Sequence, residues 1–520
     1  MISVKQAAYL KGDSTVHQLL YIVHQIRSNW EHNRITQGVF LDVSAAFDKV
    51  WHNGLIAKLG QIGIEGNFLN TIKTYLSGRR QVVVVDGVES DVQEVHAGVP
   101  QGSRLGPLLF IIYINDITYN LESNILIFAD DTSLLAHGND PAETAAILNR
   151  DLLKILDWAK KWKVTFNANK SKDIIFSRKL LNNSPPIMFD NSVINRVNIQ
   201  KHLGIYLTSS LDWGIQVNEM CLKANRKLSV LRSVKYLDRQ TLDILYKLTV
   251  RSVFDYGLPV FYNSLKQTEK ARLENLQYKA AKLVTGAYHL SSQQKLNCEL
   301  GWETIKTRSD ILGLNIFHKI HKRETRPLIW SCMPKNDLGT NIHLRSKGCY
   351  LSFPSKGTGF SKSFFPYISK LWNSFEIGVK NKNVKDFKIH TKTMKPKKIK
   401  HFGRGGKEAN SLLTKIRIGR SDLNQHKFTI GHVNTPECLC HFKEESPKHF
   451  FLDCFLYTQE RQQLFSLIGH YIPKFERMNK TEKFNIILFG LNNENEEFVY
   501  LNTLITKLVQ KFIIKTKRFA

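Results

Sequence analysis

The sequence predicts an α+β fold over about the first 210 residues, followed by a mainly helical region. A short apolar run over Thr36–Val43, with Asp42 near its end, is typical of a buried strand. Two further apolar runs flank the adjacent acids Asp130 and Asp131, and this pattern predicts a hairpin with both carboxylates at its tip. Beyond Leu211 the apolar residues recur at helical spacing, which indicates amphipathic helices with Arg and Lys on their polar faces.

The remaining elements follow in order along the chain. Ser44 is placed to cap a helix over residues 45–59, where apolar side chains recur at a helical period. Asp86-Gly87 is a typical two-residue turn for a hairpin between residues 81 and 98. A loop over residues 99–103 leads into the next helix. The other predicted helices cover residues 105–120, 141–162, 213–236, 239–254 and 268–285, and short strands cover residues 173–176 and 203–207.

The composition favours a folded protein that binds a polyanion. The chain has 520 residues and 42% hydrophobic content, which is enough for roughly two to four domains with substantial cores. Its formal charge is +29 and its pI is about 9.7, so nucleic acid is the expected partner, ahead of an anionic membrane surface. No apolar run reaches the ~20 residues of a membrane-spanning helix and no signal-peptide pattern opens the chain, so we expect a soluble intracellular protein.

Asp42, Asp130 and Asp131 are the candidate catalytic residues. A strand-end acid and a hairpin-tip acid on neighbouring antiparallel strands converge at one edge of a sheet. Carboxylates suit Mg²⁺, and two-metal phosphoryl transfer needs acids that hold two ions about 3.5 to 4 Å apart. The sequence therefore predicts a two-magnesium site in which Asp42 and Asp130 bridge the ions. Asp131 is the third acid, and the carbonyl of Val43 adds a further oxygen ligand.

Five segments in order resemble the motifs of a known enzyme family. They are residues 41–50 (LDVSAAFDKV), residues 98–103 (GVPQGS), residues 128–131 (FADD), Asn167-x-x-Lys170-Ser171 and residues 202–205 (HLGI). In this order they resemble the reverse transcriptase motifs of Jockey-type non-LTR retrotransposons, and the ordered set is far more specific than one Ala-Asp-Asp match. The resemblance covers residues 6 to about 209 and implies the palm of a right-hand polymerase with partial fingers.

The resemblance also implies roles for residues around the acids. Phe47 resembles the bulky side chain that abuts the sugar 2′ position and excludes ribonucleotides; a core aromatic is its alternative. Gln101 and Gly102 resemble the loop beneath the incoming nucleotide and the template. Lys170 resembles a lysine that protonates pyrophosphate as a general acid, with a solvated lysine on a turn as its alternative. Asp48 matches the family pattern, and its simplest role is a local cap or pair.

Two departures from the family pattern are expected to matter. Residues 6–15 resemble the family's Gln-x-Gly-Phe…Ser-Thr segment, which places the start of this chain inside the fingers. The chain is therefore expected to be N-terminally truncated, without the basic residues that grip the triphosphate and without the family's upstream endonuclease domain. Polymerase chemistry is then encoded at the metal site, while the activity of the truncated chain is an open question.

The expected domain order is a polymerase followed by basic and Cys/His regions. Residues 1–209 form the palm and partial fingers, 210–310 a helical thumb, 311–407 a basic connector, and 408–520 a C-terminal lobe with the Cys/His segment. The thumb is expected to hold template and primer through phosphate contacts that weaken with salt. Within the connector, residues 377–407, including Lys400, are expected to be an exposed basic linker or a nucleic-acid arm.

The Cys/His segment supplies four possible metal ligands. Seven cysteines in 520 residues are too few for a disulfide scaffold. Cys438, Cys440, His449 and Cys454 have the ligand types of a Cys₃His zinc site, although the Cys-x-Cys step is shorter than usual. The segment also resembles one found C-terminal to the polymerase in the same elements. Zn²⁺ is expected here, with a reduced metal-free cluster as the alternative, and His441 is expected to be solvated.

We therefore expect an RNA-directed DNA polymerase, a nucleotidyltransferase that joins a dNTP to a primer 3′-hydroxyl by two-metal catalysis. Its expected cofactors are two Mg²⁺ ions and Zn²⁺. Its expected partners are an RNA template, a DNA primer or target DNA and dNTPs, without a membrane, and the nucleus is its expected site of action. The rival from another class is a catalytically impaired nucleic-acid-binding remnant. A group II intron maturase fits the Phe-Ala-Asp-Asp form and the Cys/His segment poorly, and the C-terminal half shows no convergent acids of an RNase H.

Overall fold

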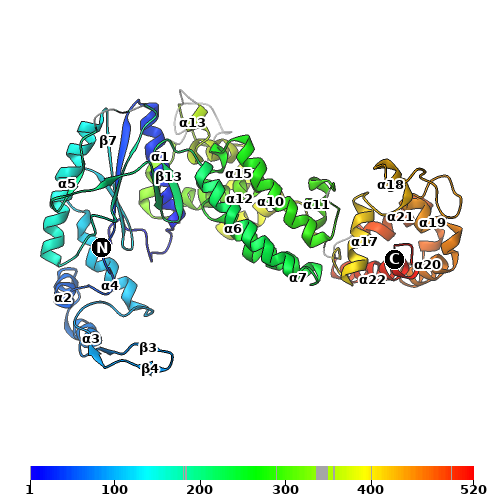
Figure 1. Cartoon of the computed structure of the whole chain (residues 1–520), viewed down its shortest axis with the longest axis horizontal. Helices are drawn as coiled ribbons and strands as arrows, with labels where there is room; N and C mark the ends of the chain where they lie inside the picture. Colours follow the sequence, from blue (N-terminus) through cyan, green and yellow to red (C-terminus); the bar gives the residue numbers. More distant parts are fainter. Residues whose placement is uncertain are drawn as a thin grey trace. The chain divides into compact units, whose positions relative to one another are not determined.

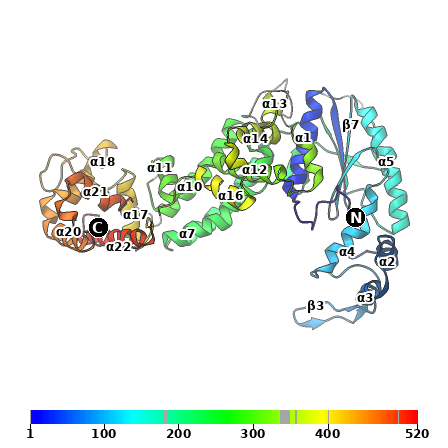
Figure 2. The ribbon, with the colours of Figure 1, turned by 180° about the vertical axis from the view of Figure 1, so that it is seen from behind.

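The chain forms two compact units, each assembled from three segments that are far apart in the sequence. The computed structural model in Figures 1 and 2 describes residues 2–179, 181, 184–288, 290–334, 349–354, 358–399, 401–492 and 495–519. Unit 1 contains residues 1–216, 257–265 and 312–388, and unit 2 contains residues 217–256, 266–311 and 389–520. Each unit therefore combines residues from more than one of the four predicted regions.

Unit 1 mixes helices and strands, as the sequence predicted for the first 210 residues. Its elements up to residue 208 are α1 (Thr15–Glu31), β1 (Ile35–Leu41), α2 (His52–Gln61), α3 (Gly66–Leu76), β2 (Arg80–Gln81), β3 (Val84–Val85), β4 (Val88–Glu89), β5 (Gln93–Glu94), α4 (Leu105–Ile114), η1 (Asn115–Thr118), β6 (Asn124–Phe128), β7 (Asp131–Gly138), α5 (Pro141–Trp162), β8 (Lys172–Phe176), β9 (Met188–Phe189), β10 (Ser192–Val193), β11 (Asn195–Arg196), β12 (Ile199–His202) and β13 (Ile205–Thr208). Short helices complete the unit: α9 (Leu258–Phe261), η3 (Tyr262–Ser264), η4 (Pro327–Cys332), α13 (Thr358–Ser361), α14 (Phe364–Asn373) and α15 (Ile377–Lys380).

A five-stranded sheet with the order β11-β8-β1-β7-β6 forms the centre of unit 1. β1 is antiparallel to both of its neighbours, β7 and β8. Every residue of β1 is buried because α1 packs on one face of the sheet and α5 on the other (Figures 1 and 2). Burial on both faces explains why the strand reads as a nearly continuous apolar run. Its buried Gln37 donates to Asp173 Oδ1 at 2.9 Å and accepts from Thr144 Oγ1 at 2.7 Å.

The helix predicted over residues 45–59 is wrong in its first turns. Regular helix begins only at His52, and residues 44–49 form turns in which Ala45 has a φ of +49°. Ser44 does not cap a helix, because turns rather than regular helix follow it, and its N–H donates to the Thr165 carbonyl at 2.8 Å. The carbonyl of Val50 accepts from Gly98 N–H at 2.8 Å. Hydrogen bonds to distant loops therefore interrupt the predicted helix, although the N–H groups of Asp48 and Lys49 still donate to the Ala45 carbonyl.

The other predicted elements of unit 1 differ mainly in length. The hairpin turn at Asp86-Gly87 is confirmed, with φ values of +50° and +83°, and it joins β3 to β4. The helix predicted over residues 105–120 ends at Ile114 and continues as the 3₁₀ turn η1. Helix α5 has the predicted bounds, 141–162. The strand predicted at residues 203–207 is β13, and its antiparallel partner β12 was not predicted because its residues are mostly polar.

Unit 2 is built from helices in the part of the chain that the structure describes. They are α6 (Gly214–Ser233), α7 (Arg239–Leu245), the π-helical turn η2 (Tyr246–Arg251), α8 (Ser252–Asp255), α10 (Gln267–Thr285), α11 (Gln293–Leu300), α12 (Ile305–His321), α16 (Val384–Thr391), η5 (Lys392–Met394), α17 (Lys407–Arg417), α18 (Asn424–Thr429), α19 (Pro447–Leu452), η6 (Phe455–Tyr457), α20 (Thr458–Tyr471), η7 (Phe475–Arg477), α21 (Lys480–Phe489) and α22 (Glu496–Lys515); α6, α12 and α16 also contribute residues to unit 1. The three helices predicted between residues 213 and 285 are confirmed, the middle one with a π-helical turn inside it.

The basic stretch at residues 377–407 is not simply an exposed linker. Residues 377–394 carry α15, α16 and η5. Phe387 of α16 is fully buried and stacks on His318, with ring centroids 4.0 Å apart. Lys398 pairs with Asp243 at 2.6 Å, and Lys400 lies outside the described residues. Burial of apolar side chains between the lysines accounts for the helices that the charge pattern did not predict. Each helix in the described part of the chain is too short or too polar to cross a membrane.

Candidate functional site

The backbone around Asp42 is held by a loop that follows α5. β1 ends at Leu41, and the N–H of Asp42 donates to Ser171 Oγ at 3.2 Å. The carbonyl of Asp42 accepts from Asn167 N–H at 2.8 Å. Val43 is buried and forms an antiparallel bridge with Phe166. The predicted Asn-x-x-Lys-Ser motif thus fixes the strand end that carries the first acid.

Asp130 and Asp131 lie at the tip of the β6–β7 hairpin. Phe128 pairs with Asp131, which leaves Ala129 and Asp130 as a two-residue turn, and Ala129 has a φ of +58°. On the neighbouring strand pair, Leu41 of β1 lies opposite Thr132 of β7. Continuing this register by one residue places Asp42 opposite Asp131 at the same edge of the sheet. The structure therefore brings the three predicted acids together.

The three acids are close enough for their negative charges to interact. Although Asp131 is an exposed residue, partial desolvation of its carboxyl and the negative charges of Asp130 and Asp42 raise its pKa to about 6. Among the described residues, no lysine or arginine forms an ion pair with any of the three. Clustered oxygen donors without a protein cation fit a divalent metal such as Mg²⁺. The three carboxylates could hold such ions.

The loop at residues 98–103 is bonded to the turn that follows Asp42. Val99 N–H donates to the Phe47 carbonyl at 2.8 Å, and Gln101 Nε2 donates to Asp48 Oδ1 at 2.7 Å. Asp48, expected to cap or pair locally, is instead the partner of Gln101, which lies 53 positions along the chain. Gly98 has a φ of +92°, and a Cβ on it would lie 2.7 Å from the Asp48 carbonyl oxygen, so this position requires glycine. Gly102 has a φ of +80° and open space around it.

Phe47 and Lys170 lie in the two segments that flank the acids. The Phe47 ring stacks on Phe110 of α4, with centroids 4.6 Å apart and an interplanar angle of 27°. Phe47 is half-buried, so part of its surface is packed on the core and part is accessible. Lys170 is exposed, and its N–H donates to Asn167 Oδ1 at 3.2 Å. Its loop is the one that bonds to Asp42.

The four predicted zinc ligands converge in unit 2. The ligand atoms of Cys438, Cys440, His449 and Cys454 all lie within 4.8 Å of one another, and all four residues are buried. Cys438 Sγ and Cys454 Sγ are 3.7 Å apart, and Cys440 Sγ is 3.2 Å from His449 Nε2. Tetrahedral zinc with Zn–S bonds of about 2.3 Å places two sulfurs ~3.8 Å apart, so this spacing fits the ion. His441, predicted to be solvated, is 90% exposed.

The surroundings of the cluster are mainly apolar. Burial and the neighbouring thiols raise the pKa of Cys438 to about 12, so without a metal this thiol is neutral at pH 7. A metal ion would reverse this effect by stabilising thiolates. The ring of Phe442 stacks on His449 at 4.4 Å, and the three cysteines belong to an apolar cluster of buried residues in unit 2. The shorter Cys-x-Cys step therefore does not prevent convergence of the four ligands.

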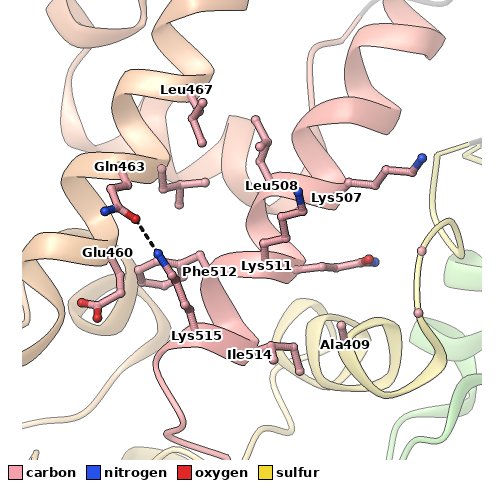
Figure 3. A pocket seen from close by; sticks show the side chains of 14 residues that line it. Ala409, Glu460, Gln463, Leu467, Lys507, Leu508, Lys511, Phe512, Ile514 and Lys515 are labelled. Carbon is pink, nitrogen blue, oxygen red and sulfur yellow. Dashed lines mark hydrogen bonds between the residues drawn. The ribbon is translucent and has the colours of Figure 1, made fainter.

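A separate cavity of about 580 Å³ lies in unit 2 and contains none of the predicted site residues (Figure 3). Its lining is mostly apolar and includes Leu464, Leu508 and Phe512. Lys507, Lys511 and Lys515, one turn apart on α22, also line it. Sequence reasoning missed this cavity, although lysines at every fourth position of an amphipathic helix are a signal for such a basic row.

Comparison with known proteins decides the family of the first half of the chain. Residues 1–237 match the profile described as reverse transcriptase (RNA-dependent DNA polymerase). Residues 1–237 belong to the reverse transcriptase family. This match contains the three clustered acids and the loops bonded to them. The fold prediction is therefore confirmed at the level of a reverse transcriptase domain.

The relatives are polymerases of non-LTR retrotransposons. The chain is 28% identical over 330 residues to the probable RNA-directed DNA polymerase from transposon X-element of Drosophila melanogaster, covering 62% of this chain and 35% of that protein. It is 29% identical over 307 residues to the RNA-directed DNA polymerase from mobile element jockey of Drosophila funebris, covering 55% and 32%. The predicted resemblance to Jockey-type reverse transcriptases is confirmed. The chain spans about a third of the length of these two relatives.

A longer and weaker match extends into the C-terminal half. The Pol polyprotein from type-1 retrotransposable element R1 of Bradysia coprophila is 23% identical over 474 residues, covering 88% of this chain and 44% of that protein. Among solved structures, a telomerase from Candida albicans in complex with a fragment of telomeric RNA covers 55% of this chain and 54% of its own, at 11% identity. Its TM-score of 0.31 is too low to carry an argument.

Proposed function

We propose that this chain is the RNA-directed DNA polymerase of a non-LTR retrotransposon, which joins a dNTP to a primer 3′-hydroxyl on an RNA template. The observation that carries this proposal is the strand register that places Asp42 opposite Asp131 at the edge of a sheet, inside the reverse transcriptase domain. In this proposal the sheet of unit 1 is the palm, the hairpin and helices between residues 52 and 98 belong to the fingers, and α6, α7 and α10 belong to the thumb.

Asp42, Asp130 and Asp131, with the carbonyl of Val43, would hold two Mg²⁺ ions. When bound, magnesium would activate the primer hydroxyl and stabilise the leaving pyrophosphate. The loop with Gln101 and Gly102 supports the nucleotide and the template base, and the Gln101–Asp48 hydrogen bond fixes its position relative to the acids. Lys170 gives a proton to the pyrophosphate oxygen as it leaves.

The partner proposed for the basic surfaces is RNA with its DNA primer. The charge of +29 supports a polyanionic partner. The lysine row on α22 lines a cavity together with apolar side chains, and such a surface suits phosphates and bases together. Primer extension with Mg²⁺ on an RNA template tests the proposed function. Template-dependent addition of dNTPs supports the polymerase, whereas salt-sensitive RNA binding without extension supports the non-catalytic remnant.

The contact of Phe47 with the sugar is tested by its effect on nucleotide selection. Phe47→Ala is expected to raise the use of ribonucleotides relative to deoxyribonucleotides by ~10-fold, because a smaller side chain leaves room for a 2′-hydroxyl. The measurement is single-nucleotide addition with a dNTP and the matching rNTP. Phe110→Leu is the control, because it disturbs the same stacked pair from the side of α4. If both variants lose the same stability and the preference for dNTP over rNTP is unchanged, Phe47 is a core aromatic only.

We also propose that Cys438, Cys440, His449 and Cys454 hold one structural Zn²⁺. Purified protein is expected to contain about one zinc per chain by mass spectrometry of its metals, and the Cys454→Ala variant is expected to contain almost none, because structural zinc needs all four ligands. Removal of the metal by a chelator is expected to lower the melting temperature, since zinc binding contributes to folding. The exposed Cys298, replaced by serine, is the matched control. A folded wild-type lobe without zinc would establish the metal-free alternative.

A further inference from the structure

The segment before α1 runs beside the strand that leads to the acidic hairpin. Ala7 N–H donates to the Ile127 carbonyl at 2.9 Å, and Ile127 N–H donates to the Lys5 carbonyl at 3.0 Å. Gln6 forms a parallel bridge with Ile127. Residues 5–7 therefore extend the sheet on the open side of β6, next to the turn that carries Asp130.

The side chain of Gln6 reaches this turn. Gln6 is fully buried, with 0% exposure, and its Oε1 accepts from the N–H of Ala129 at 3.2 Å and from the N–H of Ala8 at 2.9 Å. Ala129 lies in the two-residue turn between the paired Phe128 and Asp131, so its N–H has no partner in the strand ladder. Ala129 also has a left-handed φ of +58°, a conformation that residues other than glycine adopt at a cost. The Gln6 amide oxygen thus supplies the hydrogen bond that fixes a strained peptide directly before Asp130.

The other end of the same amide argues against a purely structural role. Gln6 Nε2 is buried and has no hydrogen-bond partner among the described residues. A buried donor without a partner costs ~1–3 kcal/mol, so glutamine is a poor choice for packing alone at this position. What glutamine adds over an apolar side chain of the same length is the acceptor for Ala129 and Ala8.

We propose that Gln6 is a positioning residue for the metal-binding acids. It holds the Ala129 peptide in the left-handed turn and thereby sets the direction in which Asp130 presents its carboxylate beside Asp131. In this role Gln6 acts through the Ala129 peptide rather than through a contact with metal or substrate. The expected effect of Gln6 on catalysis rests on the proposed function. The expected effect of Gln6 on metal affinity does not depend on catalysis. Partners that orient metal ligands typically change metal affinity or activity by about 10- to 100-fold when they are replaced.

The test replaces Gln6 with methionine, which has a similar length and no amide oxygen. Gln6→Met is expected to weaken Mn²⁺ binding at the acids by ~10-fold. Binding is measured from the electron paramagnetic resonance signal of free Mn²⁺. The Asp130→Ala variant measures the Mn²⁺ that binds at other sites of the protein. In primer extension it is expected to lower kcat by ~10-fold and to raise the Mg²⁺ concentration for half-maximal rate, while KM for dNTP changes less than about threefold. Gln18→Met is the matched control, because Gln18 is a buried glutamine of the same unit, on α1, with an unpartnered amide.

Three results separate the outcomes. Weaker Mn²⁺ binding in Gln6→Met but not in Gln18→Met, with both variants folded, supports the positioning role. Unchanged Mn²⁺ affinity and an unchanged Mg²⁺ requirement in Gln6→Met overturn it, even if the variant melts at a lower temperature. If the wild type binds Mn²⁺ at the acids without extending a primer, the proposed polymerase function fails while the Mn²⁺ comparison still decides the role of Gln6.

Discussion

Replacing Asp130 with asparagine is expected to lower the rate of primer extension by at least ~1,000-fold, with RNA affinity changed by less than about twofold. A thousandfold loss corresponds to ~4 kcal/mol of transition-state stabilisation, which is within the several kcal/mol that a correctly held metal supplies. Asparagine has nearly the same size as aspartate and suits the same hairpin turn. The substitution therefore removes the negative charge and keeps the fold unchanged. The measurement is single-turnover nucleotide addition on an RNA template, together with an RNA-binding titration.

Asp86→Asn is the control for this prediction. Asp86 is also an exposed aspartate in a two-residue hairpin turn of unit 1, with a φ of +50°, and it lies in the β3–β4 hairpin. Its replacement is expected to leave the extension rate within about twofold, because surface substitutions away from a site have small effects. Retention of full activity in Asp130→Asn, or an equal loss in both variants, would contradict the assignment of Asp130 to the metal site.

The sequence predicted the acids because their pattern is local. The apolar runs around Asp130 and before Asp42 indicate strands buried on both faces, and the acids stand where these runs end. The polar residues that hold these acids could not be found in this way. Gln6 is hydrogen-bonded to Ala129, which lies more than 120 positions away in the sequence. Asn167 and Asp42 are hydrogen-bonded across a similar sequence separation. Hydrogen bonds between such distant residues leave no periodic signal in either segment.

The same reasoning explains where the fold prediction failed. Residues 45–51 have helical apolar spacing, but the carbonyls of Phe47 and Val50 accept from the N–H groups of the 98–99 loop, and these tertiary contacts override the local preference. The assembly of unit 1 from three segments was also beyond prediction. Arg27 of α1, for example, donates to the Gly359 carbonyl at 2.6 Å. The sequence pattern around neither residue predicts this contact. The Cys/His ligands were predictable, by contrast, because all four occur within one short segment.

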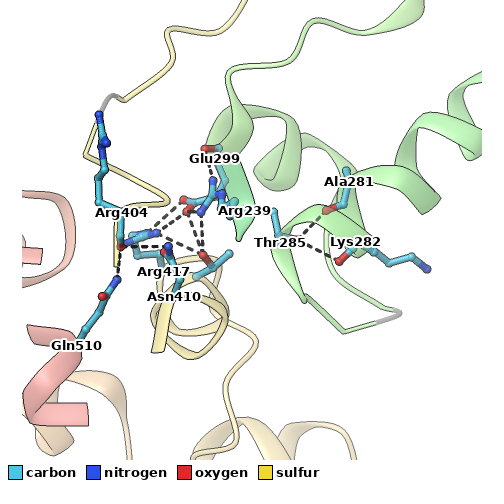
Figure 4. Close-up of polar contacts among 10 residues, drawn as sticks. Arg239, Ala281, Lys282, Thr285, Glu299, Arg404, Asn410, Arg417 and Gln510 are labelled. Atoms are coloured by element: carbon cyan, nitrogen blue, oxygen red, sulfur yellow. Dashed lines mark hydrogen bonds and ion pairs between the residues drawn. The ribbon is translucent and has the colours of Figure 1, made fainter. Parts of the chain in front are cut away.

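A buried ion cluster joins three helices of unit 2 (Figure 4). Glu299, at the end of α11, accepts from Arg239 Nη1 at 2.8 Å and from Arg417 Nη2 at 2.5 Å. Thr414 Oγ1 donates to the same carboxylate at 3.2 Å. All of these side chains are buried, and two guanidinium groups share one carboxylate. Burial alone would raise the pKa of Glu299, but the charges of Arg417 and Arg239 outweigh it and the pKa is lowered.

Glu299→Ala is expected to lower the free energy of unfolding of unit 2 by ~3–5 kcal/mol, because it leaves two buried guanidinium groups without a counter-charge. The measurement is hydrogen exchange of peptides from α11 and α17 at increasing urea concentration. Glu408→Ala removes the same charge from an exposed position on α17 and is expected to change the free energy by less than about 0.5 kcal/mol. Equal protection of α17 in both variants would show that packing rather than the ion cluster holds these helices together.

The pH dependence of the same cluster has a defined sign. Because the pKa of Glu299 is lower in the folded chain than in the unfolded one, its contribution to stability is complete above the unfolded value of about 4.3. The contribution is lost as the pH falls through the folded value, since protonation removes the charge that both arginines share. The difference in unfolding free energy between wild type and Glu299→Ala is therefore expected to be constant from pH 6 to pH 8 and to shrink below about pH 4. A difference that grows on acidification would contradict the charged state assigned to Glu299.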